Sequence, residues 1–206
     1  MNKVATNNKI IDLWFLTLAI SYLNLAKNIF QESIKCENKN TLDISYMNEK
    51  EIKEACKEFD LLTKRNDVKI IIPTLFLFYH GIEILLKWIL SLNKETVEKN
   101  HLIVNPYQIV SKKYPTIKIL EKYIKKESLI QPLKSFIDEN NVGIDNFYEY
   151  LRYPINQKET KIFRYWNLKY HEEKGLDFMK QVISDIEKIV PWSVRLYRSK
   201  EKKSQE

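Results

Sequence analysis

The chain contains few of the residues that build tight turns, disulfide frameworks and glycine-rich phosphate loops. Among its 206 residues are 3 glycines, 6 prolines and 2 cysteines. A fold of many strands needs a turn about every ten residues, so this scarcity argues against an all-β protein. The two cysteines, Cys36 and Cys56, lack the close spacing of zinc and redox motifs. We therefore expect neither a disulfide framework nor a metal site, and the sequence has no glycine-rich phosphate loop.

Hydrophobic and charged residues are both plentiful, as in a globular domain. They make up 44% and 30% of the chain, and the formal net charge is +7. A modest positive excess is compatible with a nucleic-acid partner without requiring one. The C-terminal segment from Ser193 onward carries five basic and two acidic residues. We expect one domain over residues 1–191, followed by a basic flexible tail over residues 192–206.

Helical periodicity runs through most of the chain and predicts an all-α fold. Apolar residues recur at helical spacing, and helix-starting residues such as Asn48 and Pro73 precede some of these stretches. Residues 155–166 have a polar middle and predict a short hairpin or an ordered loop before the last helix. The expected architecture is an antiparallel helical bundle. Its helices cover approximately residues 9–34, 48–63, 73–92, 105–113, 116–124, 128–140, 145–151 and 174–190, with Pro191 ending the last one.

Two apolar stretches are long enough to raise the question of a membrane. The first, residues 10–20, contains Asp12, lacks a clear signal-peptide cleavage site and continues as an amphipathic pattern. The second, residues 70–92, has the length of a membrane span but holds three ionisable residues. We interpret both as core helices, and we expect a cytoplasmic protein with no membrane partner.

The second apolar stretch keeps three polar side chains at helical spacing. His80, Glu83 and Lys87 occupy positions i, i+3 and i+7, which lie on one side of a helix. Glu83 and Lys87 also form an i, i+4 pair in the favourable order. The three residues are therefore either a structural polar cluster inside the bundle or a second candidate site. His101 lies near a helix start, and its place in the sequence predicts no chemistry.

The order of several segments resembles that of HEPN-domain proteins. These segments are Tyr79-His80-Gly81-Ile82-Glu83 with Lys87, then Asn100-His101-Leu102, then Leu151-Arg152-Tyr153-Pro154, and finally the closing amphipathic helix. HEPN-domain proteins are bacterial and archaeal helical bundles of toxin–antitoxin, abortive-infection and CRISPR-associated systems. The resemblance implies a HEPN-like bundle, a homodimer, and an antitoxin or another defence-system protein as a partner.

Many HEPN proteins are metal-independent ribonucleases, and the resemblance carries their Arg–His motif to Arg164 and His171. Six residues separate the two, a spacing that would put both side chains on one face of a continuous helix. The implied reaction is attack of an RNA 2′-hydroxyl on the adjacent phosphate, without a cofactor. His171 would act as general acid or base, and Arg164 would stabilise the phosphate charge. The implied RNA-binding residues are Arg152 and Lys169 for flanking phosphates, and Tyr165 and Trp166 for stacking on unpaired bases.

The sequence leaves three functions open. The first is a HEPN-like RNA endonuclease in a toxin–antitoxin or phage-defence system. The second is a non-catalytic HEPN-like module that binds RNA, a nucleotide or a partner protein, and the third is a structural subunit of a defence complex. The first predicts that Arg164 and His171 face each other across a positive cleft, and the second predicts that they point apart or into the core. The family usually has Asn, Asp or His directly after the Arg, where this chain has Tyr165.

Overall fold

A computed structural model describes residues 2–38, 45–98, 100–153, 162–169 and 171–203 of the chain. Within these residues the protein is all-α, its helices pack as a bundle, and no β-strand is present. The predicted fold class is therefore confirmed at this level. The predicted hairpin or ordered loop falls mainly on residues 154–161, which lie outside the described residues.

Most of the described chain is helical. In chain order the α-helices are α1 (Asn2–Lys35), α2 (Glu49–Leu62), α3 (Asp67–Leu92), α4 (Val104–Lys113), α5 (Glu121–Ile124), α6 (Leu133–Asn140), α7 (Phe147–Arg152) and α8 (Glu172–Lys203). Between them lie the short 3-10 helices η1 (Thr63–Arg65), η2 (Pro115–Leu120), η3 (Lys126–Ser128), η4 (Ile144–Asn146) and η5 (Trp166–Leu168). The predicted helix over residues 116–124 is thus a 3-10 helix followed by one α-helical turn, and the predicted helix over residues 128–140 begins only at Leu133.

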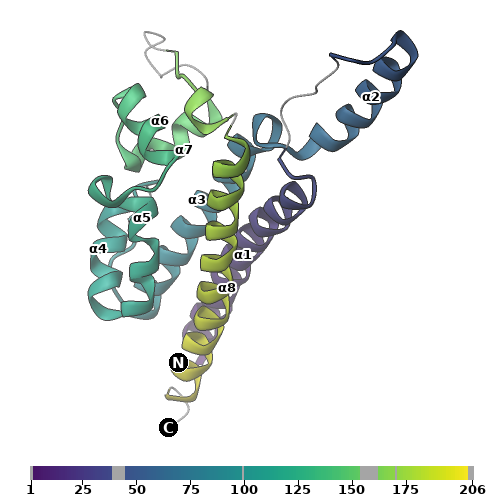
Figure 1. Cartoon of the computed structure of the whole chain (residues 1–206). Coiled ribbons are helices and arrows are strands. Elements are labelled where there is room, and N and C mark those ends of the chain that lie inside the picture. The colour runs from purple at the N-terminus through teal and green to yellow at the C-terminus, as the bar shows by residue number, and fades with distance from the viewer. Residues whose placement is uncertain (1, 39–44, 99, 154–161, 170, 204–206) are drawn as a thin grey trace.

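Helix α3 forms the centre of the bundle. From Ile71 to Leu90 most of its side chains are buried, as expected for a helix that is apolar on nearly every side. Figure 1 shows α1 and α8 side by side, with both chain ends at the same end of the bundle. Helix α1 therefore runs antiparallel to α8. Helices α4 to α7 gather on the other side of α3 (Figure 1).

Helices α1 and α3 approach each other closely at Gly81. A Cβ atom at this position would lie 2.9 Å from Cγ of Leu23 and 3.2 Å from the backbone nitrogen of the same residue. Both distances are tighter than ordinary van der Waals contact, and the second involves backbone that cannot rotate away. Glycine at position 81 therefore sets the distance between α1 and α3.

One buried carboxylate joins the ends of α1, α3 and α8. The side chain of Asp67, in the first turn of α3, accepts hydrogen bonds from Nδ2 of Asn38 at 3.1 Å and from the backbone N–H of His171 at 2.8 Å. The backbone N–H of Asp67 in turn donates to Oδ1 of Asn38 at 2.7 Å. Because His171 directly precedes α8, the carboxylate lies at the positive end of that helix, where it is stabilised.

Helix α3 begins at Asp67, earlier than the predicted start at Pro73. Asn66 has the extended backbone of an N-cap, and its side chain accepts a hydrogen bond from the backbone N–H of Lys69 at 3.3 Å. Pro73 stands inside the helix, on its exposed side. Its missing N–H removes one backbone hydrogen bond, and the cap together with the burial of Ile71 outweighs that loss.

The prediction that Pro191 ends the last helix is wrong. Helix α8 continues to Lys203, so residues 192–203 of the predicted tail are helical. Pro191 lies on the exposed side, whereas Ser193 is fully buried and Trp192 packs edge-on against Tyr114 with ring centroids 5.8 Å apart. These contacts hold the chain in a helix beyond the proline, although the proline itself weakens the local hydrogen bonding.

The predicted cap of α2 is confirmed. The side chain of Asn48 accepts hydrogen bonds from the backbone N–H groups of Lys50 and Glu51, both at 3.1 Å. The side chain of Glu51 accepts one from the backbone N–H of Asn48 at 2.8 Å, which completes a capping box. Figure 1 shows α2 projecting away from the bundle.

Two stretches, Leu13–Lys35 and Glu49–Leu92, are long and apolar enough to cross a membrane by length and composition. A buried core helix passes the same test, as does an N-terminal signal sequence. In the second stretch, 56% of the apolar window is buried inside the structure, against 28% in the first. Helix α3 thus uses most of its apolar surface in the core, whereas α1 leaves much of its own surface uncovered.

Candidate functional site

The three polar residues predicted on one side of the central helix do lie together. Glu83 is 5% exposed within α3. Its Oε1 accepts a hydrogen bond from Nζ of Lys87 at 2.7 Å, and its Oε2 lies 3.5 Å from Nδ1 of His80. A buried carboxylate without such partners would be strongly unfavourable, so the i+4 ammonium and the i−3 imidazole explain why an acid is tolerated at this depth.

A fourth residue, His101, joins this cluster from outside the helix. It lies in the connection between α3 and α4, and its Nδ1 is 3.1 Å and 3.3 Å from the two carboxylate oxygens of Glu83. The His101 side chain is 62% exposed, so the carboxylate links the protein interior to the surface through an imidazole. No local sequence pattern predicts this role for His101, because the contact spans 18 positions and depends on how the connection folds back.

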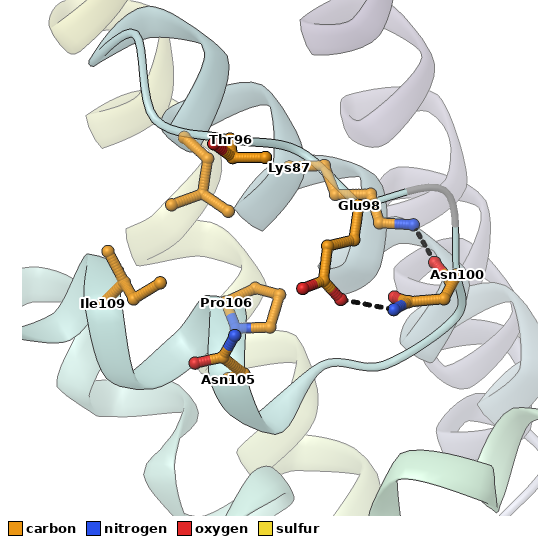
Figure 2. Close-up of a pocket in the computed structure, with 8 residues that line it drawn as sticks. Lys87, Thr96, Glu98, Asn100, Asn105, Pro106 and Ile109 are labelled. Carbon is orange, nitrogen blue, oxygen red and sulfur yellow. Dashed lines mark hydrogen bonds between the residues drawn. The ribbon is translucent and has the colours of Figure 1, made fainter.

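The connection that carries His101 is fixed by hydrogen bonds on both sides of that residue. Lys87 donates to the backbone carbonyl of Asn100, and Nδ2 of Asn100 donates to the carboxylate of Glu98 at 2.5 Å (Figure 2). Oδ1 of Asn100 accepts a hydrogen bond from the backbone N–H of Leu102 at 3.3 Å. The His101 ring is therefore positioned by its neighbours in the chain as well as by Glu83.

The ring of His80 also contacts two aromatic rings. Tyr22 of α1 meets the His80 ring edge-on, with centroids 4.6 Å apart, and Phe76 stacks on it at 6.0 Å. Together, His80, Glu83, Lys87 and His101 form the Glu83 cluster. Helix α1 contributes to the geometry of this cluster through Tyr22.

The cluster keeps Glu83 ionised. Burial by itself raises the pKa of the Glu83 carboxyl. Hydrogen bonds from His80 and Lys87, together with the charges of Lys87 and His101, more than offset that effect and lower the pKa of Glu83 to about 2. At neutral pH the group is therefore a carboxylate, which can orient an imidazole and stabilise its protonated form.

The cavity beside Lys87 is too small for a nucleotide. Figure 2 shows Thr96, Glu98 and Asn105 around it, and its volume is about 20 Å³, which is room for roughly one water molecule. Of the cluster residues, His101 is instead the one whose ring is open to solvent. Among the described residues, no group of three or more His, Cys, Asp and Glu residues is arranged to hold a metal ion.

The predicted catalytic pair lies elsewhere, on either side of η5. Nη1 of Arg164 forms a salt bridge with Oε1 of Glu139 at 2.7 Å, and its guanidinium lies over the ring of Trp166, 5.3 Å from the centroid. Nε2 of His171 lies 2.5 Å from the backbone carbonyl oxygen of Asn167. The two residues therefore share no helix, and each side chain is engaged with a different partner.

The predicted RNA-binding residues differ in what they contact. Tyr165 donates its hydroxyl to the carbonyls of Tyr150 and Tyr153 at 2.5 Å and 3.0 Å, and burial raises its pKa to about 12. Its ring also stacks on a buried phenylalanine, so Tyr165 serves packing. The guanidinium of Arg152 lies over the Tyr153 ring. Trp166 is half-exposed, and Lys169 is partly buried.

The fold and the Glu83 cluster together define an all-α bundle with a buried carboxylate between imidazole and ammonium groups. The chain matches no protein-family model, and no curated protein and no solved structure matches it at a significant level. Its function is therefore inferred from the site itself.

Proposed function

We propose that this chain is a HEPN-like antiparallel bundle that cleaves single-stranded RNA without a metal, in a toxin–antitoxin or phage-defence setting. The observation that carries the proposal is the contact of the exposed His101 ring with the buried Glu83 carboxylate at 3.1 Å. A carboxylate that holds an imidazole at the surface is an arrangement for general acid–base chemistry. The net charge of +7 favours a polyanionic substrate.

In the proposed reaction His101 accepts the proton of an RNA 2′-hydroxyl while its oxygen forms a bond to the adjacent phosphorus. The bond from phosphorus to the 5′-oxygen then breaks, and the imidazolium returns the proton to the leaving oxygen. The products are a cyclic phosphate and a 5′-hydroxyl end. Glu83 stabilises the imidazolium between the two steps and acts as a positioning residue.

The Arg164–His171 motif remains a second candidate for the same reaction. For it to act, Arg164 has to leave Glu139, and His171 has to leave the carbonyl of Asn167. This requirement also favours the alternative function, a non-catalytic HEPN-like module that binds RNA, a nucleotide or a partner protein, because separate engagement of the two side chains is what that alternative predicts.

The test is cleavage of labelled single-stranded RNA in the presence of EDTA by the purified wild type and by single variants. We expect wild-type cleavage to fall by at least about 100-fold in His101→Ala, and we expect His171→Ala to keep most of the rate. Glu83→Gln is expected to slow cleavage mainly through kcat, since it changes the orientation of His101 rather than RNA binding.

Two other outcomes point elsewhere. Loss of cleavage in folded His171→Ala but not in His101→Ala would move the reaction to the Arg164–His171 motif. If the wild type binds RNA but does not cleave it at several salt concentrations, the alternative function, a non-catalytic module, would be supported. Circular dichroism of each variant separates a chemical loss from a folding defect.

A further inference from the structure

Helix α1 is apolar on two opposite faces, and only one of them is covered. One face enters the core through residues that include Leu16, Ala19, Leu23, Ala26 and Phe30. On the other face Trp14 is 71% exposed, Leu18 46% and Leu25 48%. Leu13 and Phe15 at the edges are also exposed, and the surface around Trp14, Leu18 and Ser21 is open and mostly apolar. A helix whose outer face meets only water would carry polar residues there.

The spacing along the exposed face is that of a helix seam. Trp14, Leu18, Ser21, Leu25 and Asn28 follow one another at intervals of four, three, four and three residues. This 3.5-residue period is the heptad spacing by which one helix packs along another. The buried face of α1 already contacts α3 and α8, so the seam is an additional one.

The composition of the seam fits a second protein helix better than lipid. Ser21 lies at its centre, Asn28 lies in its last turn, and the hydroxyl of Ser21 is bonded back to the carbonyl of Thr17 at 2.9 Å. A small residue at the centre lets two helices approach. A lipid-facing stripe, by contrast, would be apolar throughout with basic residues beside it.

The seam is also free of charges that would repel an identical copy. Between Leu13 and Gln31 the sequence contains one charged residue, Lys27. Nζ of Lys27 lies 3.9 Å from Oε1 of Glu187 on α8, on the side of α1 away from the seam. An identical chain can therefore approach this face without placing like charges opposite each other.

We propose that two copies of the chain pair through the exposed face of α1, with the two helices antiparallel about a twofold axis. In the heptad register this pairing puts Trp14 opposite Leu25 of the partner subunit, and Leu18 opposite Ser21 of the partner subunit. Each contact then occurs twice. The exposed apolar residues supply on the order of several hundred Å² per copy, which approaches the roughly 800 Å² that each side of a stable interface buries.

The pairing is inferred without reference to the proposed ribonuclease activity, but the paired face lies next to the Glu83 cluster. Tyr22, on the edge of the seam, contacts His80 of the Glu83 cluster with ring centroids 4.6 Å apart. Pairing through α1 fixes the helix that carries Tyr22, so it stabilises the cluster geometry in both subunits.

The first test is the mass of the full chain by analytical ultracentrifugation at micromolar concentration. We expect a species of twice the 24.8 kDa chain mass for the wild type and a monomer for Leu18→Glu with unchanged helix content. Leu61→Glu, a matched change of an exposed leucine on α2, is expected to leave the dimer intact. A monomeric wild type, including one that binds lipid vesicles as a monomer, would overturn the proposal, as would a Leu18→Glu chain that stays dimeric.

The second test determines the register of the two α1 helices by disulfide crosslinking. In a background with Cys36 and Cys56 changed to serine, Trp14→Cys and Leu25→Cys chains are mixed and oxidised with copper–phenanthroline. The antiparallel register gives a disulfide-linked dimer only in the mixture, whereas neither variant alone forms the link. Crosslinking of Trp14→Cys with itself would indicate parallel helices and contradict the proposed arrangement.

Discussion

Nδ1 of His101 lies 3.1 Å from the carboxylate of Glu83, although the two residues are 18 positions apart and belong to different elements. The same carboxylate oxygen accepts a hydrogen bond from Lys87. One buried acid thus holds an exposed imidazole and a nearly buried ammonium at once. Neutralising Glu83 changes the surroundings of both groups together, so stability and site geometry are coupled at this position.

Glu83→Gln is expected to lower the free energy of unfolding at pH 7 by on the order of 3 kcal/mol. The pKa of Glu83 is lowered from 4.5 to about 2 in the folded protein. A carboxyl whose pKa is lowered by folding contributes stability that is fully present above pH 4.5 and is lost as the pH falls through about 2. Urea unfolding of wild type and variant at a series of pH values measures this contribution.

Glu187→Gln is the matched control, because Glu187 is half-exposed and its contact with Lys27 is long at 3.9 Å. Its effect is expected to stay below about 0.5 kcal/mol at every pH. If Glu83→Gln and wild type kept the same stability difference from pH 7 down to pH 2, ionisation of Glu83 would not be the source of that difference.

Gly81→Ala is expected to destabilise the bundle by about 1 to 3 kcal/mol, because the added methyl group would lie 2.9 Å from Cγ of Leu23. Gly143→Ala is the control, since a Cβ atom there meets nothing within 4 Å. That change is expected to be neutral or slightly stabilising. Thermal unfolding of both variants gives the comparison. Equal melting temperatures would show that α1 can shift away from position 81 without a loss of stability.

Pro191→Ala is expected to stabilise the protein by about 1 to 3 kcal/mol. The substitution restores an N–H donor inside α8 and removes the ring that crowds the preceding turn. Pro115→Ala, at the first residue of η2, replaces a proline where the missing N–H matters little, and we expect no comparable gain. A lower melting temperature for Pro191→Ala would mean that the packing of Trp192 depends on a bend at the proline.

Asp185→Ala is expected to lower the free energy of unfolding by about 3 kcal/mol. Oδ2 of this buried acid accepts hydrogen bonds from Nζ of Lys122 and from the hydroxyl of Tyr123, both at 2.7 Å. Removing it leaves an ammonium and a buried hydroxyl without their acceptor. Asp138→Ala breaks the exposed pair with Lys134 and is expected to change stability by less than about 0.5 kcal/mol. Denaturant unfolding of the two variants distinguishes them, and similar losses would contradict a special role for the buried acid.

The sequence predicted the parts of the fold that depend on local pattern. The helical class, the cap at Asn48 and the shared side of His80, Glu83 and Lys87 all follow from spacing within one segment. The predicted end of the last helix was wrong because tertiary contacts determine where that helix ends. Burial of Ser193 carries α8 past Pro191, a position at which local rules end a helix.

The geometry of both candidate sites also depends on tertiary structure. His101 reaches Glu83 through the folded connection after α3, which no local pattern encodes. For the Arg164–His171 motif the sequence gives the spacing of the two residues but does not predict the backbone conformation between them. The intervening residues include the 3-10 helix η5 rather than a continuous α-helix, so their number alone did not bring the side chains to one face.

The carboxylate of Asp67 has a consequence for how the protein opens. It bonds the residue before α8 and the segment after α1, and it belongs to the first turn of α3. A fluctuation that frees the start of α3 therefore breaks the hydrogen bonds to both of the other segments. Their backbone amides are expected to exchange with solvent together and slowly, while the opposite end, where both chain termini lie, frays independently (Figure 1). The end of the bundle that contains Asp67 is thus expected to open as one unit, separately from the end with the chain termini.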